Sequence, residues 1–285
     1  MHLISVIMNC YNGEKYLKES VTSVLNQKYQ KWELIFWDNK SNDHSREIFL
    51  KFDDIRLKYY YAEKFTNLSE ARNLAIEKAK GKLITFLDVD DLWDNNKLLN
   101  QYNFYTKNKM KIIYSNYRIL NERNNKTKIY SKKKLPQGNI TDYLLREYCV
   151  GLVTLMIESS IFKIKEYSFS NEYSIIGDFD LILRLSKKYQ IGCYQNPICT
   201  LRKHAMNDSF VSLSKQITEL ESWSKKNQLD FFFKKNISLL ISKIIYLKFI
   251  NHIIKYNRID SLKYIFAQKN ILKKLKIIFI FLFIS

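Results

Sequence analysis

The first 120 residues alternate between two hydrophobic periods, and this alternation restricts the fold more than any other feature of the chain. Short runs rich in β-branched and aromatic residues predict strands over residues 3–8, 33–37, 57–61, 82–87 and 111–114. Apolar residues at helical spacing predict helices over residues 13–27, 43–51, 68–80 and 95–107. Strands and helices that alternate in this way predict an α/β fold with a mostly parallel sheet flanked by helices.

The rest of the chain predicts a second structured part and a helical end. Residues 120–140 are dominated by Asn, Lys and Tyr and predict a loop or a hairpin. The next stretch predicts helices over residues 141–148 and 179–188 and strands over residues 152–158 and 190–201. From about residue 210 onward every segment has helical character. We therefore predict an α/β domain over residues 1–210 and a helical extension over residues 211–285.

The net charge of +19 lies in the second half of the chain. Residues 1–100 hold 15 basic and 15 acidic side chains, residues 101–200 hold 16 and 8, and residues 201–285 hold 16 and 5. A neutral front half beside a basic rear indicates that the rear meets an anionic partner. Nucleic acid and an anionic membrane surface both satisfy this condition, and composition does not separate them.

Residues 231–285 interleave lysine with Ile, Leu, Phe and Tyr. This composition fits amphipathic helices that lie on an anionic membrane with their lysines among the headgroups. It fits equally a helical bundle that packs against the domain and leaves its lysines in water. The longest uninterrupted apolar run, residues 277–284, has eight residues, whereas about 20 are needed to cross a bilayer. Any membrane contact is therefore expected to be peripheral.

The cysteines predict a reduced compartment. Cys10, Cys149, Cys193 and Cys199 form neither a CxxC pair nor a zinc-ligand pattern. The first apolar run is short and lacks the basic region of a signal peptide. We expect a cytoplasmic protein, at most peripheral on the inner face of the cytoplasmic membrane.

Polar clusters follow three of the predicted strands, at residues 9–13, 38–43 and 88–91. In parallel sheets, ligands bind at the carboxyl ends of the strands, so these clusters are expected to converge. Asp88, Asp90 and Asp91 repel one another unless a cation or strong donors compensate. Mg²⁺ and Mn²⁺ take such oxygen ligands and often share them with substrate phosphates. The alternative for this cluster is an acidic turn or a helix cap.

The residues around these clusters resemble glycosyltransferase family 2, whose members have the GT-A fold. The string ISVIMNCYNGEKYL at residues 4–17 resembles the start of that family, and residues 38–43 are similar to its DDGSTD segment. Further matches follow in the family's order at residues 23–27, 71–73, 79–81 and 86–91. The likeness continues more weakly to about residue 210.

The resemblance implies a Rossmann-like GT-A domain over residues 1–210, with a nucleotide-binding half (1–118) and an acceptor-binding half (119–210). It implies that a nucleotide-sugar donor is bound by Cys10, Tyr11, Asp38, Asn39, Arg72 and Asp88. In this scheme Asp90 ligates Mn²⁺ or Mg²⁺. Arg72 lies near the base or the diphosphate, and Asp88 binds the ribose or supports the metal.

Two residues of the first half depart from the family's pattern. Asn9 stands where Pro is usual, and Asn39 stands where many members have a second Asp that contacts the base. The preference for one donor base is therefore not fixed by this resemblance.

Residues 176–184, IGDFDLILR, resemble the family's EDxxLxxRL helix start. The resemblance implies that Asp178 is the catalytic base, with Gly177 in place of the usual Glu. A carboxylate at a helix N-terminus can accept the acceptor's proton as the new bond forms. Asp180 is a rival for this role, and helix capping is the alternative for either residue.

Residues 201–209, LRKHAMNDS, are similar to the family's YRxHxxNxS segment. The resemblance implies that His204 is a metal ligand or a diphosphate contact, and an imidazole ligand suits Mn²⁺ better than Mg²⁺. A structural role for His204 remains the alternative. Arg202 and Lys203 offer positive charge to a departing diphosphate.

Together these features predict an inverting, metal-dependent glycosyltransferase. Its expected donor is a nucleotide-diphosphate sugar, most simply a UDP-sugar, and its acceptor a glycan or a lipid-linked sugar in lipopolysaccharide, capsule or other surface-glycan assembly. A sugar-nucleotide nucleotidyltransferase would need a Gly-rich phosphate loop after the first strand, where residues 9–14 offer one Gly. A non-enzymatic basic protein that binds nucleic acid or membrane would not explain the clustered aspartates, and we expect no nucleic-acid partner.

Overall fold

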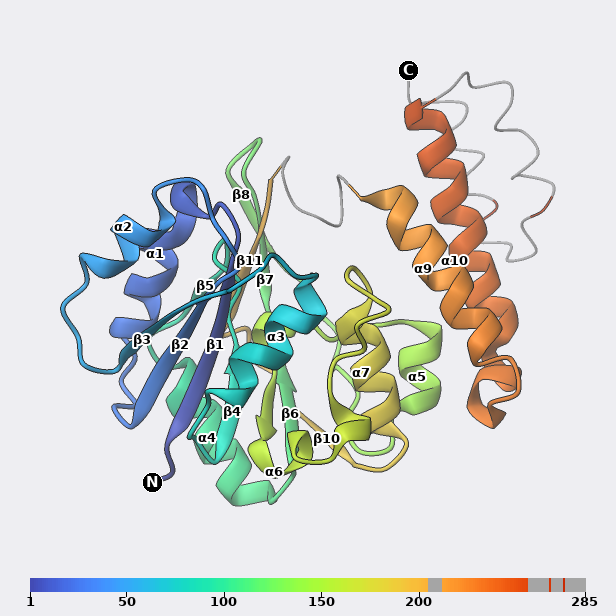
Figure 1. Cartoon of the computed structure of the whole chain (residues 1–285). Coiled ribbons are helices and arrows are strands. Elements are labelled where there is room, and N and C mark those ends of the chain that lie inside the picture. The colour runs from blue at the N-terminus through green and yellow to red at the C-terminus, as the bar shows by residue number, and fades with distance from the viewer. Residues whose placement is uncertain (205–211, 256–266, 268–273, 275–285) are drawn as a thin grey trace. The chain divides into compact units, whose positions relative to one another are not determined.

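The computed structural model describes residues 1–204, 212–255, 267 and 274 and divides the chain into two compact units (Figure 1). Unit 1 comprises residues 1–140 and 149–204, and unit 2 comprises residues 141–148 and the residues from 205 onward. The boundary predicted at residue 210 lies outside the described residues. Each unit is a separate body with its own packing.

The central sheet of unit 1 has seven strands in the order β10-β6-β9-β4-β1-β2-β3. They are β1 (Ile4–Cys10), β2 (Trp32–Asp38), β3 (Leu57–Tyr61), β4 (Leu83–Phe86), β6 (Ile112–Ser115), β9 (Met156–Glu158) and β10 (Ile191–Tyr194). All neighbouring pairs are parallel except those of β9, which runs antiparallel to both β4 and β6. The predicted mostly parallel sheet is confirmed.

Helices cover both faces of this sheet. They are α1 (Glu14–Leu25), α2 (Ser45–Leu50), α3 (Leu68–Glu77), α4 (Lys97–Asn108), α6 (Ser159–Phe162) and α7 (Gly177–Ser186), with single 3₁₀ turns η1 (Leu152–Thr154) and η2 (Lys165–Tyr167). Leu17 and Val21 of α1 belong to the same buried cluster as Val6 of β1. The buried Ala71 and Ala75 of α3 lie outside that cluster, although α3 contacts both β1 and β2. Successive strand residues point to opposite faces, so α1 and α3 cover different sides.

A second, four-stranded sheet has the order β5-β11-β7-β8. Its strands are β5 (Leu92–Trp93), β7 (Arg118–Asn121), β8 (Lys126–Ile129) and β11 (Cys199–Lys203). The antiparallel β7–β8 pair confirms the hairpin expected over 120–140. The single strand predicted over 190–201 is wrong: the chain breaks near Pro197, which has no N–H for a ladder, and β10 and β11 enter different sheets. The strand predicted over 152–158 is half correct, because it begins with η1.

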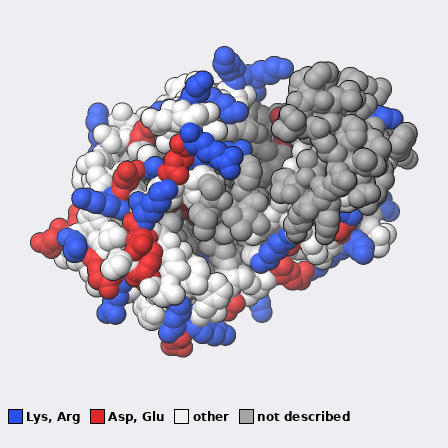
Figure 2. All heavy atoms as spheres, turned by 90° about the horizontal axis from the view of Figure 1, so that it is seen from above, with Lys and Arg blue, Asp and Glu red and all other residues white. Residues whose placement is uncertain are grey.

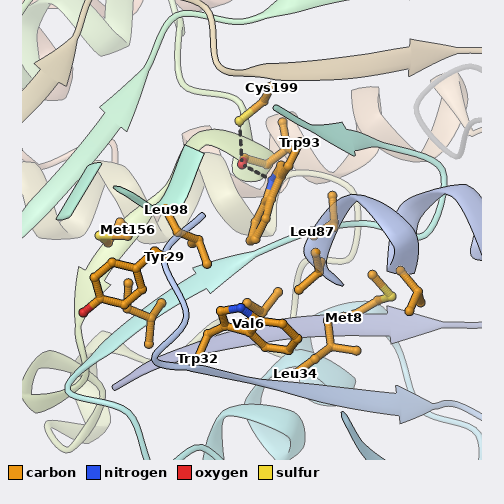
Figure 3. Close-up of a cluster of buried hydrophobic side chains, with 14 of the residues drawn as sticks. Val6, Met8, Tyr29, Trp32, Leu34, Leu87, Trp93, Leu98, Met156 and Cys199 are labelled. Atoms are coloured by element: carbon orange, nitrogen blue, oxygen red, sulfur yellow. Dashed lines mark hydrogen bonds between the residues drawn. The ribbon is translucent and has the colours of Figure 1, made fainter. Parts of the chain in front are cut away.

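Large side chains fill the core of unit 1 (Figure 3). The Trp93 indole and the Cys199 thiol both donate hydrogen bonds to the Val153 carbonyl, at 3.2 and 3.3 Å. Trp93 and Cys199 face each other across the β5–β11 pair. The second sheet is therefore tied to the core immediately behind the polar loop that follows β4.

The described part of unit 2 contains the helices α5 (Thr141–Arg146), α9 (Leu213–Lys226) and α10 (Phe231–Lys255). α10 contacts both α5 and α9. Trp223 packs edge-on against Phe233 with 5.4 Å between ring centres, and the Asp142 carboxylate accepts from Lys235 and Asn236, each at 2.9 Å. Within residues 1–204 and 212–255, no helix combines the length and the apolar character needed to cross a membrane.

Candidate functional site

The loops after β1, β2 and β4 meet at the carboxyl edge of the central sheet. The backbone N–H groups of Asn12 and Gly13 donate to the hydroxyls of Ser41 and Ser45, at 3.1 and 2.9 Å. A Cβ atom on Gly13 would lie only 2.9 Å from Val89 in the loop after β4. The glycine is therefore required by a close approach between loops, and the predicted convergence of the three polar clusters is confirmed.

Asp38 and Asn39, expected to line the nucleoside pocket, are buried and engaged within the protein. The Asp38 carboxylate accepts from the Ser41 N–H at 2.7 Å and from the Tyr59 hydroxyl at 2.8 Å. The Asn39 amide donates to the Thr66 carbonyl at 2.8 Å and accepts from both the N–H and the hydroxyl of Thr66. Their polar atoms hold the loops together, so a direct donor contact by either side chain stays a prediction.

Tyr11 and Cys10 occupy opposite environments at the end of β1. Tyr11 is exposed, and its ring lies edge-on to the exposed ring of Phe65, with 4.8 Å between centres. Cys10 is buried, and burial raises the pKa of its thiol to about 11. An exposed aromatic pair can stack on a flat base, whereas the neutral Cys10 thiol supports the loop from beneath.

Arg72 reaches the first carboxylate after β4. Its guanidinium is buried, lies over the Phe169 ring at 5.5 Å and pairs with Asp88 at 3.3 Å. The Asp88 side chain keeps 38% of its surface exposed. The sequence did not predict this ion pair between Arg72 and Asp88, and the open side of the carboxylate remains accessible to a ligand.

Asp90 and His204, the two predicted metal ligands, lie together. Oδ2 of Asp90 is 2.8 Å from Nε2 of His204. Burial raises the pKa of Asp90 and the charge of Asp88 raises it further, while the bond to His204 opposes the rise. The two residues are 114 apart in the sequence, and β11 brings them together because it ends beside the loop after β4.

Asp91 and Arg202 fix this loop from behind. The buried Asp91 carboxylate accepts from the Arg202 N–H at 2.9 Å, and the Arg202 side chain donates to the Asp90 carbonyl at 3.0 Å. Burial, followed by the charges of Asp90 and Asp88, raises the pKa of Asp91 well above its usual range. The Arg202 guanidinium also pairs with Glu19 at 2.5 Å, so its donors are engaged within the protein and support the loop.

Tyr16 was not anticipated from the sequence and contacts both His204 and Arg202. Its ring centre is 4.8 Å from that of His204, and the Arg202 guanidinium lies over the Tyr16 ring at 4.6 Å. Its hydroxyl donates to Glu122 at 2.8 Å. Glu122 is 106 residues away in the chain, so no local pattern could have marked this position.

Asp178 lies in the first turn of α7, and that turn is pressed against α3. A Cβ atom on Gly177 would come within 2.5 Å of the Ser69 hydroxyl, which explains the glycine where the family usually has Glu. Burial raises the pKa of Tyr117, and among the charges that raise it further are those of Asp178 and Asp91. Asp178 and Asp91 therefore both lie near the Tyr117 hydroxyl.

The rival carboxylate, Asp180, is buried and committed to Arg184. Two guanidinium nitrogens of Arg184 donate to Asp180 Oδ2, at 3.0 and 2.7 Å. The same guanidinium donates to the backbone carbonyls of Glu166 and Ser168. This ion pair anchors η2 to α7, and it favours Asp178 over Asp180 as a base.

A divalent cation fits this donor set only with help from a substrate. Within residues 1–204 and 212–255, no three His, Cys, Asp or Glu side chains are grouped to hold a metal by themselves. Asp90 and His204 supply one oxygen and one nitrogen at hydrogen-bonding separation. Such a pair suits an ion that takes its remaining ligands from diphosphate oxygens and water.

The face of unit 1 seen from above carries both signs of charge, and acidic and basic side chains intermingle on it (Figure 2). This mixture agrees with the balanced charge of the first hundred residues.

Comparisons with known proteins agree with this architecture. The family model Glycosyl transferase family 2 matches residues 5–163. An Escherichia coli protein, UDP-Glc:alpha-D-GlcNAc-diphosphoundecaprenol beta-1,3-glucosyltransferase WfgD, is 33% identical over 215 residues, which cover 75% of this chain and 81% of WfgD.

Two solved structures share the fold at low sequence identity. S. aureus TarS 1–349 in complex with UDP has a TM-score of 0.64 at 17% identity, covering 96% of this chain and 80% of that one. The mannosyltransferase PcManGT from Pyrobaculum calidifontis, in complex with GDP-Man and Mn²⁺, has a TM-score of 0.63 at 12% identity, covering 99% and 87%. The predicted GT-A fold and enzyme class are confirmed. This chain belongs to glycosyl transferase family 2 and is a glycosyltransferase.

Proposed function

We propose that this enzyme transfers a sugar from a nucleotide-diphosphate donor, most simply a UDP-sugar, to an acceptor hydroxyl with inversion at the anomeric carbon. The observation that carries the proposal is the Asp90–His204 pair at 2.8 Å, supported by Asp178 and Asp91 both lying near the Tyr117 hydroxyl. WfgD is named for a UDP-sugar donor and TarS binds UDP, which supports uracil as the base.

Asp90 and His204 would hold Mn²⁺ or Mg²⁺, and PcManGT binds Mn²⁺ with its donor. A divalent cation supplies charge stabilisation to a departing diphosphate. Arg72 and Asp88 would bind the adjoining part of the nucleotide. The exposed rings of Tyr11 and Phe65 would receive the base by stacking.

Asp178 would accept the proton of the acceptor hydroxyl as that oxygen attacks. Its place in the first turn of α7 suits a carboxylate that must stay ionised, because the N-terminal end of a helix favours negative charge. Attack from the face opposite the leaving diphosphate gives inversion in a single displacement.

The acceptor is proposed to be a lipid-linked sugar in the assembly of a surface glycan such as lipopolysaccharide or capsule. WfgD is named for an acceptor of this kind. The basic segment 231–285 would then provide peripheral contact with the inner face of the cytoplasmic membrane.

Donor screening and product stereochemistry test the proposal together. Thermal shift with UDP-, GDP- and dTDP-sugars plus Mn²⁺ is expected to show the largest stabilisation with one UDP-sugar. NMR of the product is expected to show an anomeric configuration opposite to that of the donor. Retained configuration would remove the single-displacement mechanism, and stabilisation by no nucleotide sugar would remove the donor assignment.

A further inference from the structure

The connection between α9 and α10 exposes large apolar side chains. We call residues 225–235 the α9–α10 tip. Leu229 is 79% exposed and Phe231 is 76% exposed, and among the large apolar residues that the structure describes only Ile55 exceeds them. Two such residues at one turn form a small exposed apolar patch, whereas single exposed apolar residues are common on any surface.

The tip is held in this conformation by the helices beneath it. Phe233 is buried against Trp223, and its N–H donates to the Asp230 carboxylate at 3.0 Å, which caps α10. The Asn227 side chain donates to the Trp223 carbonyl at 2.9 Å. Leu229 and Phe231 are therefore presented outward by a packed turn.

Lysines flank this apolar patch in the sequence. Lys225, Lys226, Lys234 and Lys235 are all exposed, and Asp230 is the one acidic residue of the tip. Lys225 and Lys226 stabilise the carboxyl end of α9, but a cation in the first turn of α10 opposes the helix dipole. Lys235 pairs with Asp142, whereas Lys234 does not stabilise the first turn of α10. An anionic partner outside the chain explains a lysine at this position.

We propose that the α9–α10 tip docks on an anionic lipid bilayer, with Leu229 and Phe231 inserted at the interface and the lysines among the headgroups. Apolar and basic side chains at one turn favour this partner, because transfer of Leu and Phe out of water is favourable and lysines are attracted to anionic lipid. The inference deepens the proposed function, on which it rests for its purpose, since a lipid-linked acceptor lies at a bilayer.

An environment-sensitive label tests insertion directly. The four native cysteines are buried, so Leu229→Cys provides a selectively labelled site for the fluorophore NBD in the full chain. Vesicles of phosphatidylcholine with 30% phosphatidylglycerol are expected to shift NBD emission to the blue, and pure phosphatidylcholine vesicles much less. Ile55→Cys, at an 86% exposed position of unit 1, is the matched control and is expected not to shift. Equal spectra at both positions would overturn insertion.

Substitutions separate the two contributions. The double variant Leu229→Ser/Phe231→Ser is expected to lower the vesicle partition coefficient about tenfold or more, and Lys225→Gln/Lys234→Gln is expected to lower both the partition coefficient and its salt dependence. Both variants should keep the wild-type thermal shift with UDP and Mn²⁺. If wild type itself shows no such shift, the result counts against the proposed transferase site and not against membrane docking by the α9–α10 tip. If the serine variant partitions like wild type while the glutamine variant loses binding to an RNA oligonucleotide, the tip binds nucleic acid and the inference is overturned.

Discussion

Lys97 is a buried base beneath the polar loop, and its replacement tests how burial sets protonation in this core. The side chain is fully buried on α4, donates to the Thr85 hydroxyl and lies 3.7 Å from the centre of the Trp93 ring. Burial lowers the pKa of Lys97 to about 7. Lys97→Met keeps the length of the side chain and removes its charge, and Thr85 retains its own hydrogen bond to the Leu155 carbonyl.

The magnitude follows from the lowered pKa. The ordinary pKa of a lysine is 10.5, and lowering it to about 7 corresponds to a cost of about 5 kcal/mol for the charged form. Replacement by Met also removes the contact of the Lys97 ammonium with the Trp93 ring, worth about 2 kcal/mol, so the expected net gain in stability is about 3 kcal/mol. Between pH 7 and 10.5 the unfolded chain binds this proton more readily than the folded one, so the free energy of unfolding rises with pH across that window.

Urea unfolding at pH 7, 8, 9 and 10, followed by tryptophan fluorescence, measures this effect. At pH 7 Lys97→Met is expected to be more stable than wild type by about 3 kcal/mol, and the difference should shrink as pH rises. Lys107→Met, at an exposed position of the same helix, is the matched control and should follow wild type at every pH. A difference between Lys97→Met and wild type that stays constant from pH 7 to 10 would refute the argument.

Three further predictions concern the site. Asp178→Asn is expected to lower kcat by about 10²–10⁴-fold while calorimetry shows unchanged UDP affinity; an active variant would move the base elsewhere. Tyr16→Leu should weaken Mn²⁺ binding by about tenfold or more, measured by EPR with UDP present. Tyr16→Phe keeps the ring and should keep most of the Mn²⁺ affinity. Equal losses of affinity in the two variants would assign the effect to the hydrogen bond of the Tyr16 hydroxyl. Gly177→Ala should lower the free energy of unfolding by about 1–3 kcal/mol, and adding Ser69→Ala should recover part of it; additive losses would show that the predicted contact between Gly177 and Ser69 is absent.

The front half of the fold follows from the sequence because its signals are local. The alternation of periods predicts β1 to β4 and α1 to α4 within a few residues at either end. The second sheet was not predicted, because β5 has only two residues, and these pair with Cys199 and Thr200 of β11, which are 106 and 108 residues away in the chain. Hydrophobic period identifies a strand but carries no information about its partner, and β9 shows the same limit by pairing antiparallel inside a parallel sheet.

The candidate site likewise has a part that the sequence predicts and a part that only the folded chain reveals. The carboxylates after β4 were recognisable as a group since they are adjacent in the chain, and resemblance to a family connected Asp90 with His204. The supporting contacts of Tyr16 and Arg202 were not recognisable, because each depends on side chains that only the folded chain brings together. Position in a motif thus predicted that Asp90 and His204 lie together, and tertiary packing decides which residues hold them there.

Asn39 shows how such packing gives physical meaning to a departure from the family. Its amide nitrogen donates to the Thr66 carbonyl, a bond that an ionised Asp could not make, since a carboxylate only accepts. The amide oxygen accepts from Thr66 at the same time, so the side chain is matched on both sides to one residue of the next loop. An Asp at this position would place a buried carboxylate against a carbonyl, and the loop would have to open. Recognition of the base is therefore expected to rest on Tyr11, Phe65 and backbone groups, with Asn39 setting the position of the loop that carries Phe65.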